Sequence, residues 1–126
     1  MPLVTISVLH PKTLTFKDTV LEAVHDALVR VGVPPMDLFQ RVLELSPKDF
    51  RFDREYPDVQ GARSDDFVLI EILLSTGRSV KVKKQLLSHL MHQLSAKGHN
   101  PENIMVVFQE TSWENWSFAG GRQIHV

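Results

Sequence analysis

The residue that offers the most specific chemistry in this sequence is Pro2, which directly follows Met1. Removal of Met1 would leave Pro2 with a free secondary amine at the start of residues 3–8, an apolar alternating stretch that predicts a strand. A sheet tolerates proline at the first position of a strand, where no ladder hydrogen bond is lost. Burial or a neighbouring cation would lower the pKa of such an amine toward neutrality and make it a general base. The alternative interpretation is that a small second residue only permits removal of the initiator methionine.

Large aromatic side chains near the C-terminus form a second candidate group. Trp116 and Phe118 lie in residues 113–126 and could wall a pocket or pack on a neighbouring subunit. The alternative is that they cap the core of their own chain. Gly120-Gly121 in the same stretch predicts a hairpin turn.

Metal and phosphate chemistry have little support in the sequence. His89 and His92 stand three residues apart on a predicted helix, but no nearby carboxylate completes a ligand set, so we expect no metal site. No glycine-rich phosphate loop, nucleophile elbow or zinc spacing occurs in the sequence.

Composition limits the class of protein. The 126 residues suit a single domain, and 14 lysines and arginines against 15 aspartates and glutamates argue against a nucleic-acid partner. The absence of cysteine excludes disulfides and thiolate chemistry. No apolar run approaches membrane-spanning length and no signal-peptide pattern occurs, so we expect a cytoplasmic protein without a membrane partner.

The chain repeats itself at an offset of 66 residues. Gly32 matches Gly98, Pro35 matches Pro101, and the apolar residues of two predicted helices match in the same register. Each half therefore predicts one strand, helix, turn and strand unit. Within a single domain, 1–126, we expect a first unit at about residues 2–46, a connector at 47–66, a second unit at 67–112 and a tail at 113–126.

Periodicity locates the elements of each unit. The first helix is predicted to begin at Thr15, in a capping box with Asp18, and to end at Gly32, and the second to run from near Ser79 to Gly98. The strands are predicted at residues 3–8, 38–45, 68–74 and 104–111. Right-handed crossovers then give an α/β (α+β) fold with a four-stranded mixed sheet, two helices on one face and a C-terminal hairpin. The later strands are apolar almost throughout, so we expect self-association to cover the other face.

These features together resemble the tautomerase superfamily, and most closely its malonate semialdehyde decarboxylase branch. The resemblance covers nearly the whole chain and is carried by the Met-Pro strand, the duplicated units and the order of Val33-Pro34-Pro35-Met36-Asp37, Gly77-Arg78-Ser79 and Trp116-Ser117-Phe118 with Arg122. It implies tautomerase-like duplicated β-α-β units, a homotrimer and no cofactor.

The resemblance also implies roles for individual residues. Pro2 would be the catalytic amine, Asp37 would orient a water or accept a proton, and Arg78 would hold a substrate carboxylate. The substrate-binding residues would be Arg78, Trp116, Phe118 and Arg122. From its own surroundings in the sequence, Asp37 can also be read as a turn former, as can its counterpart in the second half, Asn103.

Two positions depart from the decarboxylase pattern. Thr76 and Gly120 stand where that branch has arginine, and the missing cation at position 76 weakens the case for decarboxylation. The predicted function is therefore a cofactor-independent keto-enol tautomerase of small carboxylated oxo or enol substrates, such as phenylpyruvate, with Pro2 as base. Decarboxylation or hydration of a three-carbon oxo acid is the neighbouring alternative. The alternative of another class is a non-catalytic ferredoxin-like or ACT-type small-molecule-binding module, which has the same order of elements.

Overall fold

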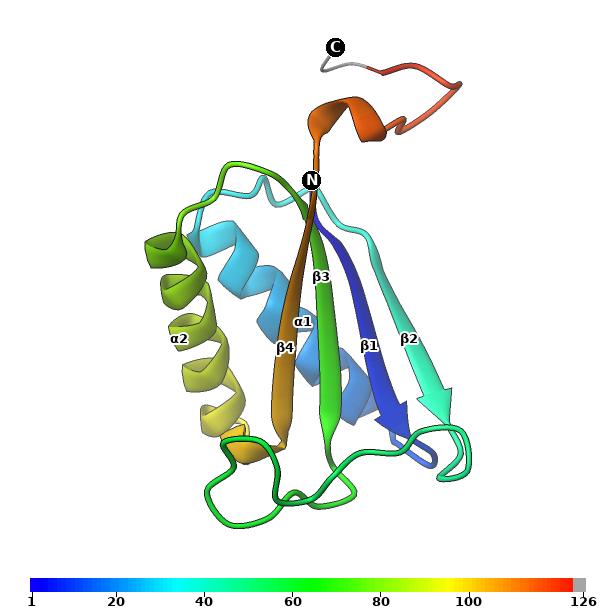
Figure 1. Ribbon diagram of the computed structural model, residues 1–126, viewed down its shortest axis with the longest axis vertical. Helices are drawn as coiled ribbons and strands as arrows, with labels where there is room; N and C mark the ends of the chain where they lie inside the picture. The colour runs from blue at the N-terminus through cyan, green and yellow to red at the C-terminus, as the bar shows by residue number, and fades with distance from the viewer. Residues whose placement is uncertain (124–126) are drawn as a thin grey trace.

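The computed structural model describes residues 1–123 and contains two longer helices and four strands in this range (Figure 1). The elements follow in the order β1 (Leu3–Leu9), α1 (Leu14–Arg30), β2 (Gln40–Leu45), β3 (Val68–Ser75), α2 (Val80–Ala96) and β4 (Ile104–Thr111). Short 3-10 helices at Pro101–Asn103 and Trp113–Asn115 flank β4. Within residues 1–123, no helix has the length and apolar character that a membrane crossing requires.

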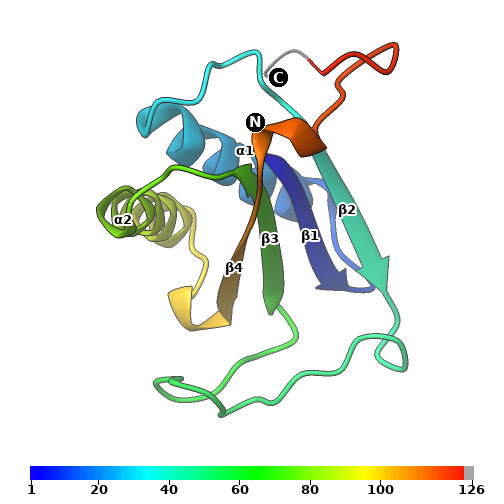
Figure 2. The ribbon, with the colours of Figure 1, turned by 45° about the horizontal axis from the view of Figure 1, so that its top comes forward.

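The four strands form one mixed sheet in the order β2-β1-β3-β4. β1 and β2 are parallel, β3 and β4 are parallel, and β1 pairs with β3 antiparallel at the centre. Both helices pack on the same face of this sheet, as Figures 1 and 2 show from two directions. The predicted four-stranded mixed sheet with two helices on one face is confirmed.

The 66-residue repeat is present in three dimensions. α1 and α2 each contain 17 residues and begin after equivalent residues, Thr13 and Ser79. The hydroxyl of each of these two residues accepts a hydrogen bond from a backbone N–H in the first turn of its helix. Gly32 and Gly98 follow the ends of the helices with φ of 107° and 86°, a left-handed conformation that favours glycine. Equivalent residues therefore begin and end the two helices.

Several predicted boundaries differ from the structure, and β1 and β3 each extend one residue beyond the predicted end, to Leu9 and Ser75. The capping box of Thr15 with Asp18 is wrong, because Thr13 has the extended backbone and the hydrogen-bonded hydroxyl that cap α1. β2 begins at Gln40 and not at residue 38, and Leu38 and Phe39 before it are 52% and 50% exposed.

The C-terminal tail does not form a strand ladder within residues 112–123. It contains the 3-10 helix Trp113–Asn115 and then a turn at Gly120-Gly121, where Arg122 N donates to Ala119 O at 3.1 Å. The predicted turn is therefore present, but it does not join paired strands in the described part of the tail. Residues 124–126, which complete the predicted hairpin, lie outside the described residues.

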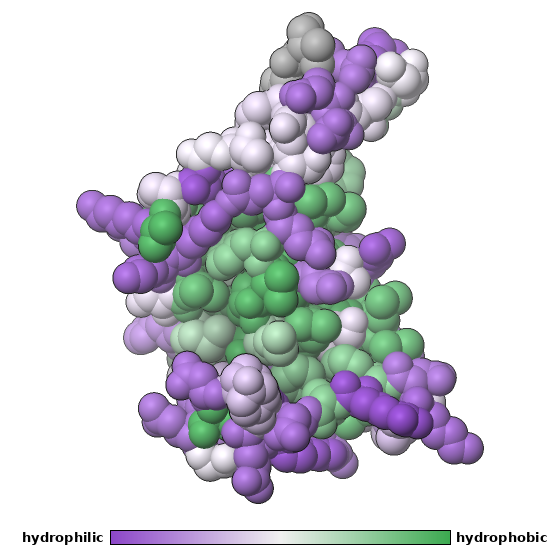
Figure 3. All heavy atoms as spheres, viewed as in Figure 1, coloured by the Kyte–Doolittle hydropathy of each residue, from purple (hydrophilic) through white to green (hydrophobic). Residues whose placement is uncertain are grey.

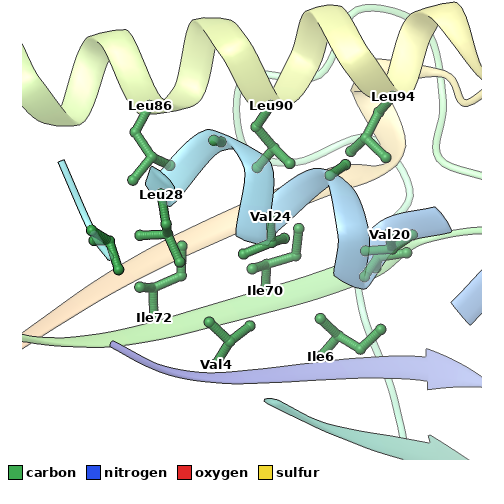
Figure 4. Close-up of a cluster of buried hydrophobic side chains, with 14 of the residues drawn as sticks. Val4, Ile6, Val20, Val24, Leu28, Ile70, Ile72, Leu86, Leu90 and Leu94 are labelled. Atoms are coloured by element: carbon green, nitrogen blue, oxygen red, sulfur yellow. The ribbon is translucent and has the colours of Figure 1, made fainter. Parts of the chain in front are cut away.

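The hydrophobic core lies between the sheet and the two helices (Figure 4). Alternate strand residues point toward the helices, so Val4, Ile6 and Ile70 are at most 1% exposed. The helices contribute residues at helical spacing, including Val24 on α1 and Leu90 on α2, both fully buried. Burial of this apolar layer fixes the helices on the sheet and thereby fixes the loops at its ends.

The other face of the sheet carries no helix and is apolar. Figure 3 views this face and shows hydrophobic surface across the strands. Leu43 of β2 and Met105 of β4 remain 43% and 39% exposed there. An exposed apolar patch of this kind marks an interaction surface, and it lies where the sequence analysis expects a covering partner.

The connector, residues 47–66, folds at the end of the sheet remote from the N-terminus (Figures 1 and 2). Phe52 stacks on Phe67 with ring centroids 4.2 Å apart, and Arg54 forms an ion pair of 2.7 Å with Asp65. The connector is held by contacts at its own end of the molecule and does not extend to the start of β1.

The ion pairs of the two halves repeat at the same offset. Lys17 Nζ lies 2.8 Å from Glu44 Oε1, and the equivalent residues Lys83 and Glu110 also form an ion pair. Glu44 Oε2 lies 2.6 Å from His10 Nδ1. The hydrogen bond from Lys17, followed by that from His10, lowers the pKa of Glu44 to about 2.

We expect this cluster to make stability depend on pH. The pKa of Glu44 falls from an ordinary value of 4.5 to about 2 on folding, so its stabilising effect is complete above pH 4.5 and is lost as the pH falls toward 2. Glu44→Gln should therefore lessen the fall in the free energy of unfolding over this pH range, measured by urea denaturation. Glu22→Gln, at an exposed glutamate of α1 outside the cluster, is the matched control. An equal fall in the wild type and in Glu44→Gln would contradict this assignment.

Candidate active site

One end of the sheet collects the residues singled out in the sequence. Because β1 and β3 are antiparallel, the start of β1, preceded by Pro2, lies beside the end of β3 at Ser75. Parallel strands begin at the same edge, so the loop that leads from α1 into β2 returns to this end as well. The tail after β4 completes the cluster of segments (Figures 1 and 2).

A cavity of about 200 Å³ opens among these segments. Pro2 on its wall is buried, and the rings of Trp116 and Phe118 stack with centroids 5.6 Å apart. The complete lining is Met1, Pro2, Leu3, Phe39, Trp116, Ser117 and Phe118. None of these side chains is charged. The tail therefore provides an aromatic wall for the cavity that contains Pro2.

Buried polar atoms without partners gather at this same end. Among the described residues four buried side-chain polar atoms lack a hydrogen bond, and three of them are Asp37 Oδ1, Ser75 Oγ and Trp116 Nε1. The fourth, Arg63 Nε, belongs to the connector at the opposite end. Native proteins pair nearly all buried polar atoms, so three unpaired ones at one end of the sheet indicate a place where a ligand or solvent completes the hydrogen bonds.

Asp37 stands in a tightly held loop. Its backbone N–H donates to Pro34 O at 3.0 Å, and His25 Nε2 of α1 lies 2.9 Å from Pro35 O. Val4 N donates to Phe39 O at 2.9 Å and ties the end of the loop to β1. Asp37 is thus a turn residue, and its half-buried carboxylate also has an oxygen left free for a ligand.

Arg78 lies in the loop that joins β3 to α2. Its side chain is half-buried, and Nη1 donates to the carbonyl oxygen of Ser75 at 3.4 Å. Ser79 caps α2 directly after it, so the guanidinium is close to the positive end of a helix. A guanidinium and a helix N-terminus together favour an anion.

The remaining predicted residues lie differently. Arg122 is exposed and is absent from the cavity lining, and its guanidinium covers Gly120 so closely that a side chain at position 120 would collide with it. Thr76 is exposed, and its backbone N–H donates to Thr111 O at 3.0 Å. The structure brings Pro2, Asp37, Arg78, Trp116 and Phe118 to one end of the sheet, but it does not place Arg122 on the cavity.

The pKa of the terminal amino group depends on burial and on two charged residues at this end of the sheet. Burial lowers the pKa of the Met1 amino group, the carboxylate of Asp37 opposes this by raising it, and the cation of Arg78 lowers it further. Both charged residues are therefore within electrostatic reach of the chain terminus. In this form Met1 acylates the Pro2 nitrogen, and removal of Met1 would expose that nitrogen to the same two charges.

The repeat permits a comparison of the two ends of the sheet. The counterpart of Asp37 is Asn103, whose Oδ1 accepts from Ser64 N at 2.8 Å and whose Nδ2 donates to Ser64 Oγ at 3.0 Å. The counterpart of Pro2 is Val68, inside β3. The second end therefore satisfies its polar group internally and has no terminal amine, whereas the first end has an unpaired carboxylate oxygen and the chain terminus.

Sequence reasoning missed Ser75, which is fully buried with an unpartnered hydroxyl at the end of β3. A signal was present in the repeat, because the residue 66 positions earlier is Leu9, an apolar residue at the end of the equivalent strand. When one of two equivalent buried strand ends has a polar residue and the other has an apolar one, packing alone does not explain the polar residue.

Within residues 1–123, no group of three or more histidine, cysteine, aspartate or glutamate side chains is arranged to hold a metal ion.

Comparison with known proteins identifies the family. A sequence family described as "Tautomerase enzyme" matches residues 37–119, more than half of the chain, and the chain therefore belongs to this family. The match begins at Asp37, so it does not include Pro2, β1 or α1.

Solved structures show the same fold over nearly the whole chain. A malonate semialdehyde decarboxylase is 28% identical, with a TM-score of 0.86 and coverage of 96% of this chain and 93% of that one. FG41 malonate semialdehyde decarboxylase, inhibited by 3-bromopropiolate, is 24% identical with a TM-score of 0.88, covering 98% and 93%. A fused 4-OT, described as a symmetric trimer, is 23% identical with a TM-score of 0.72, covering 95% and 94%. The two structures below 25% identity show the fold alone. Together with the structure at 28% identity, they confirm a tautomerase-like fold, which this chain shares with malonate semialdehyde decarboxylases.

The electrostatic assignment predicts the effect of removing the Asp37 charge. In protein that retains Met1, Asp37→Asn should lower the pKa of the terminal amine, because the carboxylate raises it. A ¹⁵N NMR titration of labelled Met1 measures this pKa without any assay of activity. Asp18→Asn, at an exposed aspartate near the start of α1, is the control. An unchanged pKa in Asp37→Asn would place the carboxylate out of reach of the terminus.

Proposed function

We propose that this chain, after removal of Met1, is a cofactor-independent keto-enol tautomerase of small 2-oxo acids, with Pro2 as general base. The proposal rests on one observation above all. A buried proline next to the chain terminus lines a cavity together with Trp116, whose indole N–H is unpaired, at the end of the sheet where Asp37 and Arg78 shift the pKa of the terminal amine. Membership of the tautomerase family supports the reaction class.

In the proposed reaction the neutral amine of Pro2 removes a proton from the carbon next to the ketone. The C–H bond breaks, an N–H bond forms, and the electron pair moves to the ketone oxygen to give the enolate. The protonated amine then gives its proton to that oxygen, which yields the enol and restores the neutral amine. In reverse the amine takes the proton of the enol O–H group and returns it to carbon. Burial of Pro2 favours this chemistry, because desolvation disfavours the charged ammonium and leaves a larger neutral fraction near neutral pH.

The surrounding residues have distinct roles in the proposal. Arg78, beside the N-terminus of α2, holds the substrate carboxylate. Asp37 orients a water or accepts a proton through its free oxygen. Trp116 and Phe118 bound the carbon skeleton on the apolar wall, which suits an aryl substituent such as that of phenylpyruvate. Arg122 contacts the substrate in this scheme only after its side chain leaves Gly120.

Decarboxylation or hydration of a three-carbon oxo acid is the second candidate. The 28% identity and TM-score of 0.86 with a malonate semialdehyde decarboxylase favour it. Thr76 opposes it, because it stands where the resemblance has a second arginine and offers no cation for the carboxylate that would leave. Release of carbon dioxide from malonate semialdehyde by wild-type protein would favour this candidate over tautomerisation.

We also propose that the chain assembles as a homotrimer. The apolar outer face of the sheet, with half-exposed Leu43 and Met105, needs cover, and fused 4-OT, whose fold this chain shares, is a symmetric trimer.

The role of Pro2 predicts a large loss of activity in Pro2→Ala. General base catalysis contributes about 10²–10⁴-fold, so kcat/KM for ketonisation of the phenylpyruvate enol should fall by about 100-fold or more. The loss of enol absorbance measures the rate, and intact mass must show that Met1 is absent. Protein that retains Met1, whose Pro2 nitrogen is acylated, should be equally inactive. Full activity in Pro2→Ala would defeat the mechanism, and ligand binding without turnover in the wild type would favour a non-catalytic module.

The role of Arg78 predicts a loss of substrate binding. Hydrogen bonds to charged groups contribute about 1.5–3 kcal/mol, so Arg78→Ala should raise KM by roughly 10- to 100-fold with a smaller effect on kcat. Arg78→Lys should be intermediate, because lysine keeps the charge but loses the planar fork. Lys81→Ala, at an exposed lysine of the first turn of α2, is the control. Equal KM values in Arg78→Ala and Lys81→Ala would remove Arg78 from the site.

A further inference from the structure

The hydroxyl of Ser75 is buried without a hydrogen-bond partner. The residue is 0% exposed, and its Oγ makes no hydrogen bond in the form that retains Met1. Leaving a buried hydroxyl unpaired opposes folding, whereas alanine would fill the same space without that cost. The choice of serine therefore indicates a partner that this form of the chain lacks.

Strand register places Ser75 beside the chain terminus. In the antiparallel pair, Leu3 of β1 is opposite Leu73 of β3. Each step toward the N-terminus on β1 corresponds to a step toward the C-terminus on β3, so this register, continued beyond the paired residues, directs Met1 and Pro2 toward the end of β3 at Ser75. Ser75 is therefore at the end of the sheet that contains the peptide bond between Met1 and Pro2, whose cleavage frees the Pro2 nitrogen.

The second half of the chain acts as an internal control. The counterparts of Pro2 and Ser75 are Val68 and Leu9, and both of these residues are apolar and at most 5% exposed. The buried serine therefore occurs at the sheet end that has a terminal proline, and leucine occurs at the end that lacks one.

Ser75 approaches the terminus from inside the protein. The cavity is lined by Met1 and Pro2 but not by Ser75, so the buried hydroxyl is not part of the cavity wall. The Ser75 carbonyl accepts a hydrogen bond from Arg78 at 3.4 Å, which helps to hold the end of β3 in place. A neutral proline amine has one N–H and one lone pair at a tetrahedral angle to each other, so a hydrogen bond that fixes the N–H also fixes the direction of the lone pair.

We propose that, after removal of Met1, Ser75 Oγ accepts a hydrogen bond from the Pro2 N–H and thereby turns the lone pair of the nitrogen toward the cavity. The inference rests on the proposed function, and it makes Ser75 a positioning residue that acts through Pro2. A hydrogen bond from the protonated amine is stronger than one from the neutral amine, so Ser75 also raises the pKa of Pro2. The charged groups that face the terminus are Asp37 and Arg78, and neither changes in this comparison.

The test compares Ser75→Ala with the wild type in processed protein. ¹⁵N titration of labelled Pro2 should show a pKa lower by about half a unit or more, because the charge-assisted hydrogen bond is lost. The pH-independent kcat/KM for the phenylpyruvate enol should fall roughly tenfold from the loss of orientation, although a larger fraction of the amine is then neutral. Ser75→Thr, which keeps the hydroxyl, should restore both values. Ser7→Ala, at another buried serine on β1, is the control.

Stability gives a second measurement. In protein that retains Met1, Ser75→Ala should leave Tm unchanged or raise it, because the hydroxyl there has no partner. In processed protein the same substitution should lower Tm.

An unchanged Pro2 pKa in Ser75→Ala would overturn the proposal even if activity fell, since the hydroxyl would then act on the substrate. A raised pKa would overturn it as well. The titration requires no turnover, so a failure of the proposed reaction would appear separately, as an active Pro2→Ala variant.

Discussion

The antiparallel pairing of β1 with β3 is the constraint on which the site depends. Two parallel β-α-β units could be joined in other ways, but only an antiparallel junction places the beginning of one unit against the end of the equivalent strand of the other. This junction brings Pro2, the end of β3 at Ser75 and the following Arg78 together. The core between sheet and helices stabilises the register, because a shift of one residue would turn buried Val4 and Ile6 away from the helices.

Duplication gave the molecule two equivalent ends, and the side chains at those ends have diverged. At one end Asn103 is bonded twice to Ser64, and Lys12, the counterpart of Arg78, pairs with Asp66 at 3.4 Å. At the other end the equivalent carboxylate has an oxygen without a partner. Identical backbone architecture thus supports a closed, self-satisfied end and an open end. The helix caps, helix lengths and ion pairs repeat between the halves, so the difference arises from the connector, which supplies Ser64 and Asp66 at one end, and from the chain terminus and tail at the other.

The open end combines features that oppose stability with features that favour chemistry. A buried amine, an unpaired carboxylate oxygen and an unpaired indole N–H each raise the free energy of the empty site. The apolar core that lies between the sheet and the helices offsets this cost at a distance. Opposed influences act on the terminal amine, with burial and Arg78 lowering its pKa and Asp37 raising it.

The sequence by itself determined the elements of the fold and the identity of the terminal proline. Periodicity, capping residues and the 66-residue repeat are local or self-referring patterns, and they predicted both helices, four strands and the β4 bounds. They missed the Thr13 cap, the start of β2, the last residues of β1 and β3, and the absence of paired strands in the described part of the tail. The resemblance added Asp37, Arg78 and the tail aromatics. The tertiary structure alone decided which of these side chains meet: it placed Trp116 and Phe118 on the cavity, left Arg122 over Gly120 and revealed Ser75. These contacts depend on the register between strands whose paired residues are 60 or more positions apart. No local pattern encodes that register, because the alternation of buried and exposed residues in one strand does not specify where its partner strand lies.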